Sequence, residues 1–181
     1  PCAIWDRNKE WHLSETDIEN EAPKLRDICK KNGLEISSLG TFGVNCKDVE
    51  RFKRIAKATK VLNCKYIRIS APGYDMSVNY YELYKETIEH LKSIQEICRD
   101  YKIKALLETH PGNIIPSASS AIRIAENFDP DYIGIIHDAG NMVCEGYERW
   151  QMGIEILGKY LAHVHAKNYA WFYKEIDGTK K

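Results

Sequence analysis

Apolar residues along the chain follow two periods, one typical of amphipathic helices and one of short buried strands. The first period predicts helices over residues 16–31, 47–62, 79–101, 117–127 and 149–157. The second predicts five strands, LEISSLGTF (34–42), KYIRIS (65–70), KALLETH (104–110), YIGIIHD (132–138) and LAHVHAK (161–167). We expect Ser14 or Thr16 to cap the first helix and Gly33 to follow its end.

Strands that alternate with helices are typical of repeated βα units around a parallel sheet. The chain has no glycine-rich phosphate loop, which an open doubly wound sheet usually shows after its first strand. We therefore predict an α/β fold of the (β/α)8 TIM-barrel class, present as a partial barrel of about five βα units. On this prediction residues 1–181 form a single domain that lacks the first two strands and the last strand of the barrel. The start at Pro1 rather than at a methionine agrees with a missing natural start.

Composition places the chain among ordinary globular proteins and narrows its expected partners. Lys and Arg number 26 and balance 26 Asp and Glu, without a basic block, so neither a nucleic acid nor an anionic membrane is expected as a partner. We find no apolar run long enough to span a membrane and no signal-peptide pattern at the start. The six cysteines form no CxxC pair, which favours a reducing, cytoplasmic setting.

Charged and imidazole side chains stand at the carboxyl ends of three predicted strands, at Glu108, Asp138 and His165. In a barrel these ends meet at one mouth, so we expect the three side chains to converge there. Each would cost several kcal/mol if it were buried without a partner, and a shared divalent cation would offset that cost. Two carboxylates and one imidazole suit Mn, Mg, Co or Zn.

Each of these residues also has a purely structural interpretation. Glu108 could form an ion pair with Arg68, Asp138 could make a turn with its own backbone, and His165 could be an interior histidine. His137 is expected to face the helices. The metal site is favoured because three such residues recur at equivalent positions in consecutive units.

The runs LLETH, HDAGN and HVHAKN, which contain Glu108, Asp138 and His165, resemble the xylose-isomerase-like (β/α)8 superfamily of sugar-phosphate isomerases and epimerases. The run KYIRIS resembles the arginine-bearing fourth strand of that family, and the resemblance covers residues 34–168. It implies one divalent metal ion held by these three residues. It also implies a second Glu ligand from the eighth strand, which has no counterpart in this chain. His165 matches the family's ligand better than His163 does, because it directly precedes the x-Lys end of the strand.

The resemblance also implies a small carbohydrate substrate. The expected activity is that of a metal-dependent isomerase or epimerase of a sugar, sugar phosphate or related polyol, by proton transfer through a metal-stabilised enediolate. Glu108 and Lys167 would act in catalysis, the first by moving a proton and the second by stabilising negative charge. The residues expected to bind substrate are Arg68, His110, Asn141 and His163. Asn141 stands where the family often has a His, so it could donate a hydrogen bond but could not act as an acid or base.

Three alternatives remain at this point. A dehydratase of an inositol-derived ketone would begin with the same proton removal. An apurinic endonuclease-like hydrolase would need a three-metal cluster, but residues 40–43 and 70–73, at the ends of the first two predicted strands, include no histidine or carboxylate. A non-catalytic sugar-binding protein would be expected to have lost its metal ligands. A homo-oligomer formed through the outer helices is a further expectation that the sequence leaves open.

Overall fold

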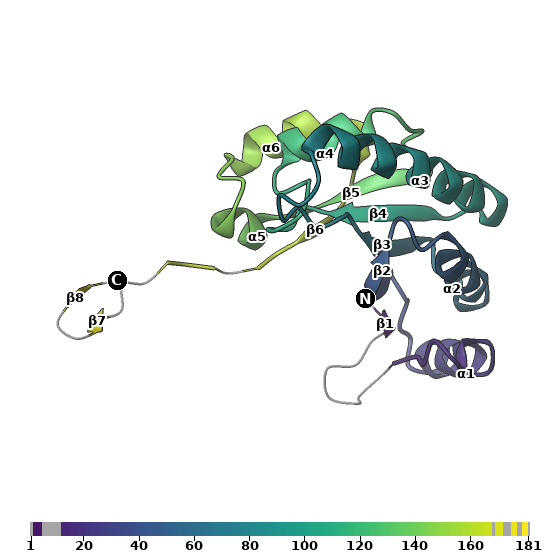
Figure 1. The fold of residues 1–181 in the computed structure, drawn as a ribbon. Coiled ribbons are helices and arrows are strands. Elements are labelled where there is room, and N and C mark those ends of the chain that lie inside the picture. Colours follow the sequence, from purple (N-terminus) through teal and green to yellow (C-terminus); the bar gives the residue numbers. More distant parts are fainter. Residues whose placement is uncertain (1, 5–11, 168, 172–174, 177–178, 181) are drawn as a thin grey trace.

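The computed structural model describes residues 2–4, 12–167, 169–171, 175–176 and 179–180. Within them, six strands form one sheet in the order of the chain, and each neighbouring pair is parallel. The strands are β1 (Cys2–Ile4), β2 (Leu39–Asn45), β3 (Tyr66–Ser70), β4 (Lys104–Glu108), β5 (Ile133–Asp138) and β6 (Leu161–His165). The described sheet curves and stays open between β1 and β6 (Figure 1), which is the arrangement of a partial barrel.

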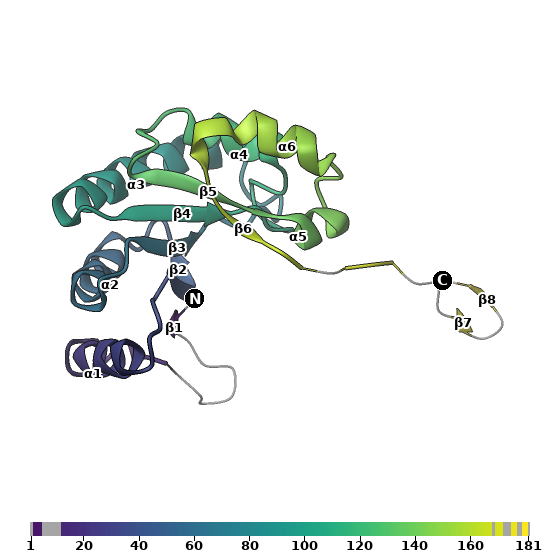
Figure 2. The same ribbon diagram turned by 180° about the vertical axis from the view of Figure 1, so that it is seen from behind.

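The longer helices of the described residues lie along the outer side of the curved sheet, as Figures 1 and 2 show from opposite directions. They are α1 (Ile18–Lys31), α2 (Val49–Leu62), α3 (Tyr80–Tyr101), α4 (Ala118–Ala125) and α6 (Trp150–Leu157). A short helix, α5 (Ala139–Cys144), follows β5 directly, and the 3-10 helix η1 (Gly158–Tyr160) precedes β6. The strands β7 (Glu175–Ile176) and β8 (Thr179–Lys180) form a separate antiparallel pair. None of the described helices combines the length and apolar composition that crossing a membrane requires.

The hydrophobic core lies between the outer row of strand side chains and the helices. Successive residues of a strand point to opposite faces, so one row of each strand packs outward and the other turns into the barrel. The outward rows of β3, β4 and β5 are fully buried and consist of Ile67, Ile69, Ala105, Leu107, Ile133 and Ile135. Phe52, Ile55 and Ala56 on α2 meet this layer, as the helical period predicted. The inward row therefore carries the polar residues singled out above.

Two predictions about the elements were wrong, and one helix was missed. The chain was expected to have five strands, but β1 adds a sixth, and its three residues are too few to show a period. Strand β2 begins at Leu39 rather than Leu34, because pairing with both β1 and β3 begins at Leu39, whereas Leu34 is 63% exposed. Helix α5 was not predicted, because its six residues are shorter than two helical turns.

The predicted cap of α1 was also wrong. Asp17 occupies the capping position, while the hydroxyls of Ser14 and Thr16 lie 2.8 Å apart and bond to each other. The end of the helix agrees with prediction, since Gly33 follows it in the left-handed conformation (φ 65°) that glycine adopts without steric cost.

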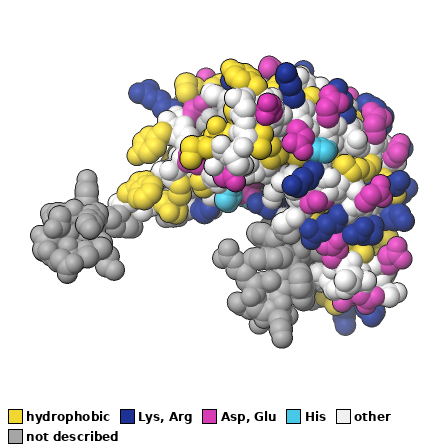
Figure 3. Space-filling view, viewed as in Figure 1, with side chains coloured by type: hydrophobic (Ala, Val, Ile, Leu, Met, Phe, Trp, Pro, Cys, Tyr) yellow, Lys and Arg dark blue, Asp and Glu magenta, His cyan; other side chains and the backbone are white. Residues whose placement is uncertain are grey.

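The surface charges are mixed. On the face shown in Figure 3, Lys and Arg side chains are interspersed with Asp and Glu.

Candidate metal centre

Glu108, Asp138 and His165 are the last residues of the neighbouring strands β4, β5 and β6. The register of the sheet pairs Asp138 with His165 and Glu108 with Ile136, so all three stand at one edge. The Nδ1 atom of His165 lies 3.1 Å from Glu108 Oε1 and 3.3 Å from Asp138 Oδ2. One ligand atom from each residue lies within 4.8 Å of the other two. The structure thus brings together the three residues that the sequence analysis selected.

Each carboxylate uses its two oxygens differently. Glu108 Oε2 accepts a hydrogen bond from Arg68 Nε, and Asp138 Oδ1 accepts one of 2.8 Å from the backbone N–H of Asn141 at the start of α5. The second oxygen of each carboxylate faces His165. The structural ion pair and the structural turn considered above are therefore both present, and each occupies only one oxygen of its residue. Glu108 is 7% exposed and Asp138 is 2% exposed, so both carboxylates are held in place by burial as well.

Neighbouring charges at the strand ends shift the pKa values of His165 and Glu108. The hydrogen bond with Glu108 raises the pKa of His165 above its ordinary value of 6.5, against the opposing effect of burial. Burial would raise the pKa of Glu108, but the hydrogen bond with His165 and the charge of Arg68 outweigh it and hold that pKa at about 2. Glu108 is therefore ionised at neutral pH, which is the state that a metal ligand requires.

The donor set fits a divalent metal ion. Two carboxylate oxygens and one imidazole nitrogen face the same point, and oxygen with nitrogen donors is the combination that Mn, Co and Zn accept. The hydrogen bonds that Glu108 accepts from Arg68 and that Asp138 accepts from the Asn141 backbone N–H orient the two carboxylates, as partners of metal-bound side chains commonly do. Within the described residues this is the one group of three such side chains with a suitable spacing.

Metal affinity is expected to rise with pH in the range where His165 loses its proton. Because the pKa of His165 is raised above 6.5, protons compete with the ion for Nδ1 at and below neutral pH, whereas Glu108 is already ionised there. Titration with Mn²⁺ by calorimetry between pH 5.5 and 8.5 tests this, with about a tenfold change in affinity per pH unit below the pKa. An affinity that does not change over this range would exclude His165 as a ligand.

The centre opens onto a cavity of about 660 Å³. This volume lies within the range typical of small-molecule sites. Its lining includes the other residues predicted for the site, namely Arg68, His110, Asn141, His163 and Lys167. A second cavity of about 220 Å³ adjoins it and shares Arg68, Glu108 and His110. The sequence therefore selected residues that line one continuous region at the mouth of the barrel.

His163, His110 and Lys167, which were also predicted for the site, differ in their contacts and in their exposure to solvent. The ring of His163 makes an edge contact with that of His165 at 5.6 Å between centroids, and burial lowers the pKa of His163. His110 is exposed, and its Nδ1 lies 2.7 Å from the Pro111 carbonyl oxygen. The side chain of Lys167 is 46% exposed, and its Nζ donates a 2.5 Å hydrogen bond to Asn141 Oδ1.

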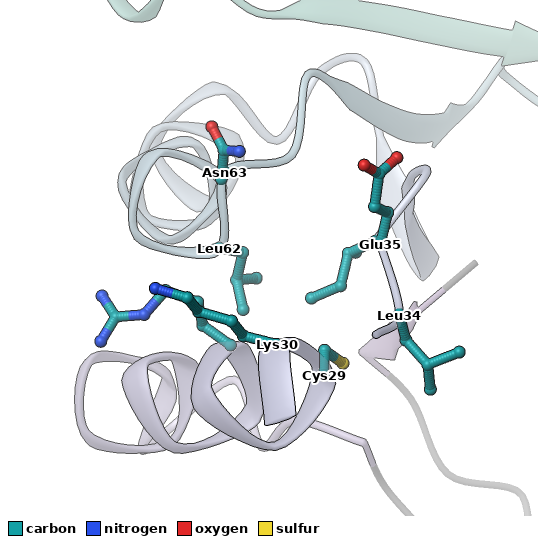
Figure 4. A pocket seen from close by; sticks show the side chains of 8 residues that line it. Cys29, Lys30, Leu34, Glu35, Leu62 and Asn63 are labelled. Atoms are coloured by element: carbon teal, nitrogen blue, oxygen red, sulfur yellow. The ribbon is translucent and has the colours of Figure 1, made fainter. Parts of the chain in front are cut away.

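A separate pocket, of about 460 Å³, lies between the ends of α1 and α2 and shares no lining residue with the centre (Figure 4). Cys29 and Lys30 of α1, Leu62 of α2 and the segment Leu34–Ile36 line it. Its mixed lining includes only one carboxylate, that of Glu35, and no histidine. The chemistry of the donors, rather than the size of a pocket, therefore selects the mouth of the barrel.

Two residues that support the centre were missed by the sequence analysis. Thr109 is fully buried, its Oγ1 accepts a 3.0 Å hydrogen bond from the Asp138 N–H, and its carbonyl accepts one of 3.1 Å from Asn141. Gly140 lies under Lys167, where a Cβ atom would come within 2.7 Å of Lys167 Cγ. Thr109 could have been noticed as a polar residue in the outward, otherwise apolar row of its strand.

His137 was expected to face the helices, and it does. It is buried, and an added Cβ at Gly153 of α6 would lie 3.0 Å from its Nε2 atom. Burial lowers its pKa, and its Nε2 has no hydrogen-bond partner in the described part of the chain. Asn168, at the end of the run HVHAKN, lies outside the described residues.

The parallel sheet and its outer helices place the chain in the class of α/β-barrel proteins. Its candidate metal centre of Glu108, Asp138 and His165 lies at the carboxyl ends of the strands, where proteins of this class have their active sites. Comparison with family models identifies it more closely. The chain belongs to the xylose isomerase-like TIM barrel family, whose model matches residues 3–176.

Among curated proteins, the chain is 24% identical over 174 residues to inosose dehydratase from Geobacillus kaustophilus. The match covers 83% of this chain and 55% of the relative. Inosose dehydratase from Mesomycoplasma hyopneumoniae (strain 7448) is 25% identical over 173 residues, with 84% of this chain and 57% of the relative covered. The chain thus spans about half the length of the curated relatives that it matches.

Solved structures share the fold at low sequence identity. The apo form of 3-keto-D-glucoside 4-epimerase from E. coli superposes with a TM-score of 0.72 at 17% identity, over 86% of this chain and 67% of that one. An IOLI protein with a bound zinc atom superposes with a TM-score of 0.65 at 18% identity, over 81% of this chain and 56% of that one. A xylose isomerase-like TIM barrel protein from Mycobacterium smegmatis, in complex with magnesium, superposes with a TM-score of 0.69 at 19% identity. The match covers 93% of this chain and 61% of that one.

Proposed function

We propose that this chain carries the metal centre of a divalent-metal-dependent isomerase or epimerase that acts on a sugar, a sugar phosphate or a related polyol. The observation that carries the proposal is the convergence of Glu108, Asp138 and His165 at the mouth of the barrel. Two structural relatives hold zinc or magnesium, and another is a sugar epimerase, which supports a metal and a carbohydrate substrate here. The ion at this centre would supply Lewis-acid polarisation of the oxygens of the substrate.

In this proposal Glu108 transfers the proton at the carbon next to a carbonyl. Arg68 and His165 hold the pKa of the Glu108 carboxyl at about 2, so at neutral pH it is in the unprotonated form that a general base requires. The side chain is nearly buried yet borders the 660 Å³ cavity, so a substrate in that cavity would contact it. Loss of the proton leaves an enediolate, which returns to an isomer or epimer when a proton is delivered to another carbon or another face.

Lys167 would stabilise the negative charge that develops on the substrate oxygen. Its ammonium group lines the cavity and is fixed by the hydrogen bond to Asn141. His110 and His163 also line the cavity and would position substrate hydroxyls. Arg68 would border the substrate beside Glu108, held there by a 2.9 Å hydrogen bond from Nη1 to the Thr41 carbonyl.

A dehydratase of an inositol-derived ketone is the second candidate, and a specific observation favours it. The curated relatives quoted above are inosose dehydratases, at 24% and 25% identity. Both reactions begin with removal of the same kind of proton, and they differ in whether a hydroxyl group then leaves.

Exchange of carbon-bound hydrogen with deuterated solvent tests the proposal. The protein, with and without Mn²⁺, is incubated in D2O with a panel of ketoses, ketose phosphates and keto-inositols, and NMR follows both the α-proton and new products. We expect Mn²⁺-dependent exchange for at least one compound. An epimer or isomer as product supports the first candidate, and loss of water supports the second. No exchange with any of these classes in the metal-loaded protein would contradict the proposal.

A further inference from the structure

Asn141 lies between Glu108 and Lys167, the two charged side chains that act in the proposed catalysis. It is 3% exposed, and its side-chain Nδ2 donates hydrogen bonds of 3.1 Å to Glu108 Oε1 and 3.1 Å to the Thr109 carbonyl. On its other side, Oδ1 accepts the 2.5 Å bond from Lys167. Both N–H groups and the carbonyl of the amide are thus bonded within the chain, so the residue acts through its neighbours.

Lys167 is held very near the metal centre without joining it. Its Nζ lies 4.0 Å from Asp138 Oδ2, the same oxygen that faces His165. The aliphatic part of the side chain crosses Gly140, where there is no Cβ atom to push it away. A small movement of the ammonium group would therefore shorten this 4.0 Å ion pair to a direct hydrogen bond with a metal ligand.

We infer that Asn141 is a positioning residue that keeps the Lys167 ammonium group off the metal-ligating carboxylates and directs it into the cavity. The inference rests on the proposed metal centre. An ammonium group bound directly to Asp138 Oδ2 would compete with a divalent cation for that oxygen, because both are positive and need the same lone pairs. Bonding to a neutral amide oxygen removes that competition. It also leaves two of the three N–H donors of Lys167 for oxygens of the substrate.

The three hydrogen bonds made by the Asn141 side chain require an amide at this position. An imidazole can accept one hydrogen bond on one nitrogen and donate one from the other, whereas the amide here makes three bonds at once. The amide also stays neutral at every pH at which the protein is folded. The arrangement therefore depends on this particular side chain.

A double-mutant cycle on Mn²⁺ binding tests the inference without any knowledge of the substrate. Four proteins are compared by calorimetry at pH 8: the unmodified protein, Asn141→Leu, Lys167→Met and the double variant. We expect Asn141→Leu to weaken Mn²⁺ binding by about tenfold, because the released ammonium group of Lys167 would then compete with the ion for Asp138 Oδ2. We expect Lys167→Met to bind at least as tightly as the unmodified protein. In the Lys167→Met background, Asn141→Leu should weaken binding by less than about threefold, because the competing cation is gone.

Equal weakening by Asn141→Leu in the two backgrounds would overturn the inference, because Asn141 would then act only through its bond to Glu108. Asn141→Ala, which brings no bulky apolar group into the site, is measured alongside and should show the same dependence on Lys167. Melting temperatures of all variants establish that each is folded. A failure of the unmodified protein to bind Mn²⁺ would instead count against the proposed metal centre, so the two failures are distinguishable.

Discussion

Replacement of Asp138 by Asn is expected to weaken Mn²⁺ binding by more than about 100-fold, beyond the effect typical of residues that only orient ligands. The substitution exchanges an ionised oxygen that faces His165 for a neutral amide and leaves Glu108 as the remaining carboxylate. The fold should survive, because Asn caps helices about as well as Asp and can still accept the hydrogen bond from the Asn141 backbone. Calorimetric titration with Mn²⁺ measures the change.

Asp131→Asn is the matched control for this variant. Asp131 is exposed and precedes the opposite end of the same strand, so the substitution removes the same charge from the chain without touching the centre. We expect Mn²⁺ affinity within about twofold of the unmodified protein for this control. An Asp138→Asn protein that is folded and binds Mn²⁺ as tightly as the control would show that the ion, if bound, sits elsewhere.

Replacement of Glu108 by Gln is expected to lower the rate of substrate α-proton exchange by about 10²- to 10⁴-fold, the range typical of a lost general base. Gln cannot take up the proton, and the side chain that it replaces is ionised at neutral pH. The exchange experiment proposed above measures this rate at saturating Mn²⁺. Arg68 also loses the negative partner of its ion pair, so thermal stability should fall in the same variant.

Two further variants separate the loss of proton exchange from the loss of thermal stability. Glu145→Gln alters a carboxylate near the barrel mouth whose Oε2 accepts a 2.6 Å hydrogen bond from the Gly112 N–H, a bond that the amide oxygen of Gln can keep. It should exchange the substrate proton at nearly the rate of the unmodified protein. Glu108→Gln combined with Arg68→Met restores charge balance and should recover part of the stability but none of the exchange. Exchange at the normal rate in Glu108→Gln would remove this residue from the proton-transfer role.

The fold could be predicted from the sequence because its elements obey simple periods. Runs such as KYIRIS and YIGIIHD, separated by amphipathic helices, predict a parallel sheet, and the comparisons confirm the partial TIM barrel. The features that the sequence did not predict are a very short strand and a strand boundary that is set by pairing with neighbouring strands. Strand β1 has three residues, and β2 starts at Leu39 because two neighbouring strands bond there. Neither fact leaves a local pattern in the sequence.

The proposed ligands could also be selected from the sequence, because a charged residue at the end of a buried strand breaks an otherwise apolar pattern. Parallel strands then bring their ends together whatever the loops between them do. The supporting contacts could not be predicted in the same way. Asn141 bonds to Glu108, 33 residues away, and to Lys167, 26 residues away, and Gly140 matters only because Lys167 crosses it. Such contacts depend on side-chain directions that the sequence does not specify.

The most direct test of the central claim is elemental analysis of the protein purified without added metal and again after incubation with Mn²⁺ or Mg²⁺. The proposed centre predicts about one divalent ion per chain, held by Glu108, Asp138 and His165. Three ions per chain would favour the hydrolase alternative with its three-metal cluster. No ion under any of these conditions would contradict the metal centre, and a non-catalytic sugar-binding function would then become the better interpretation.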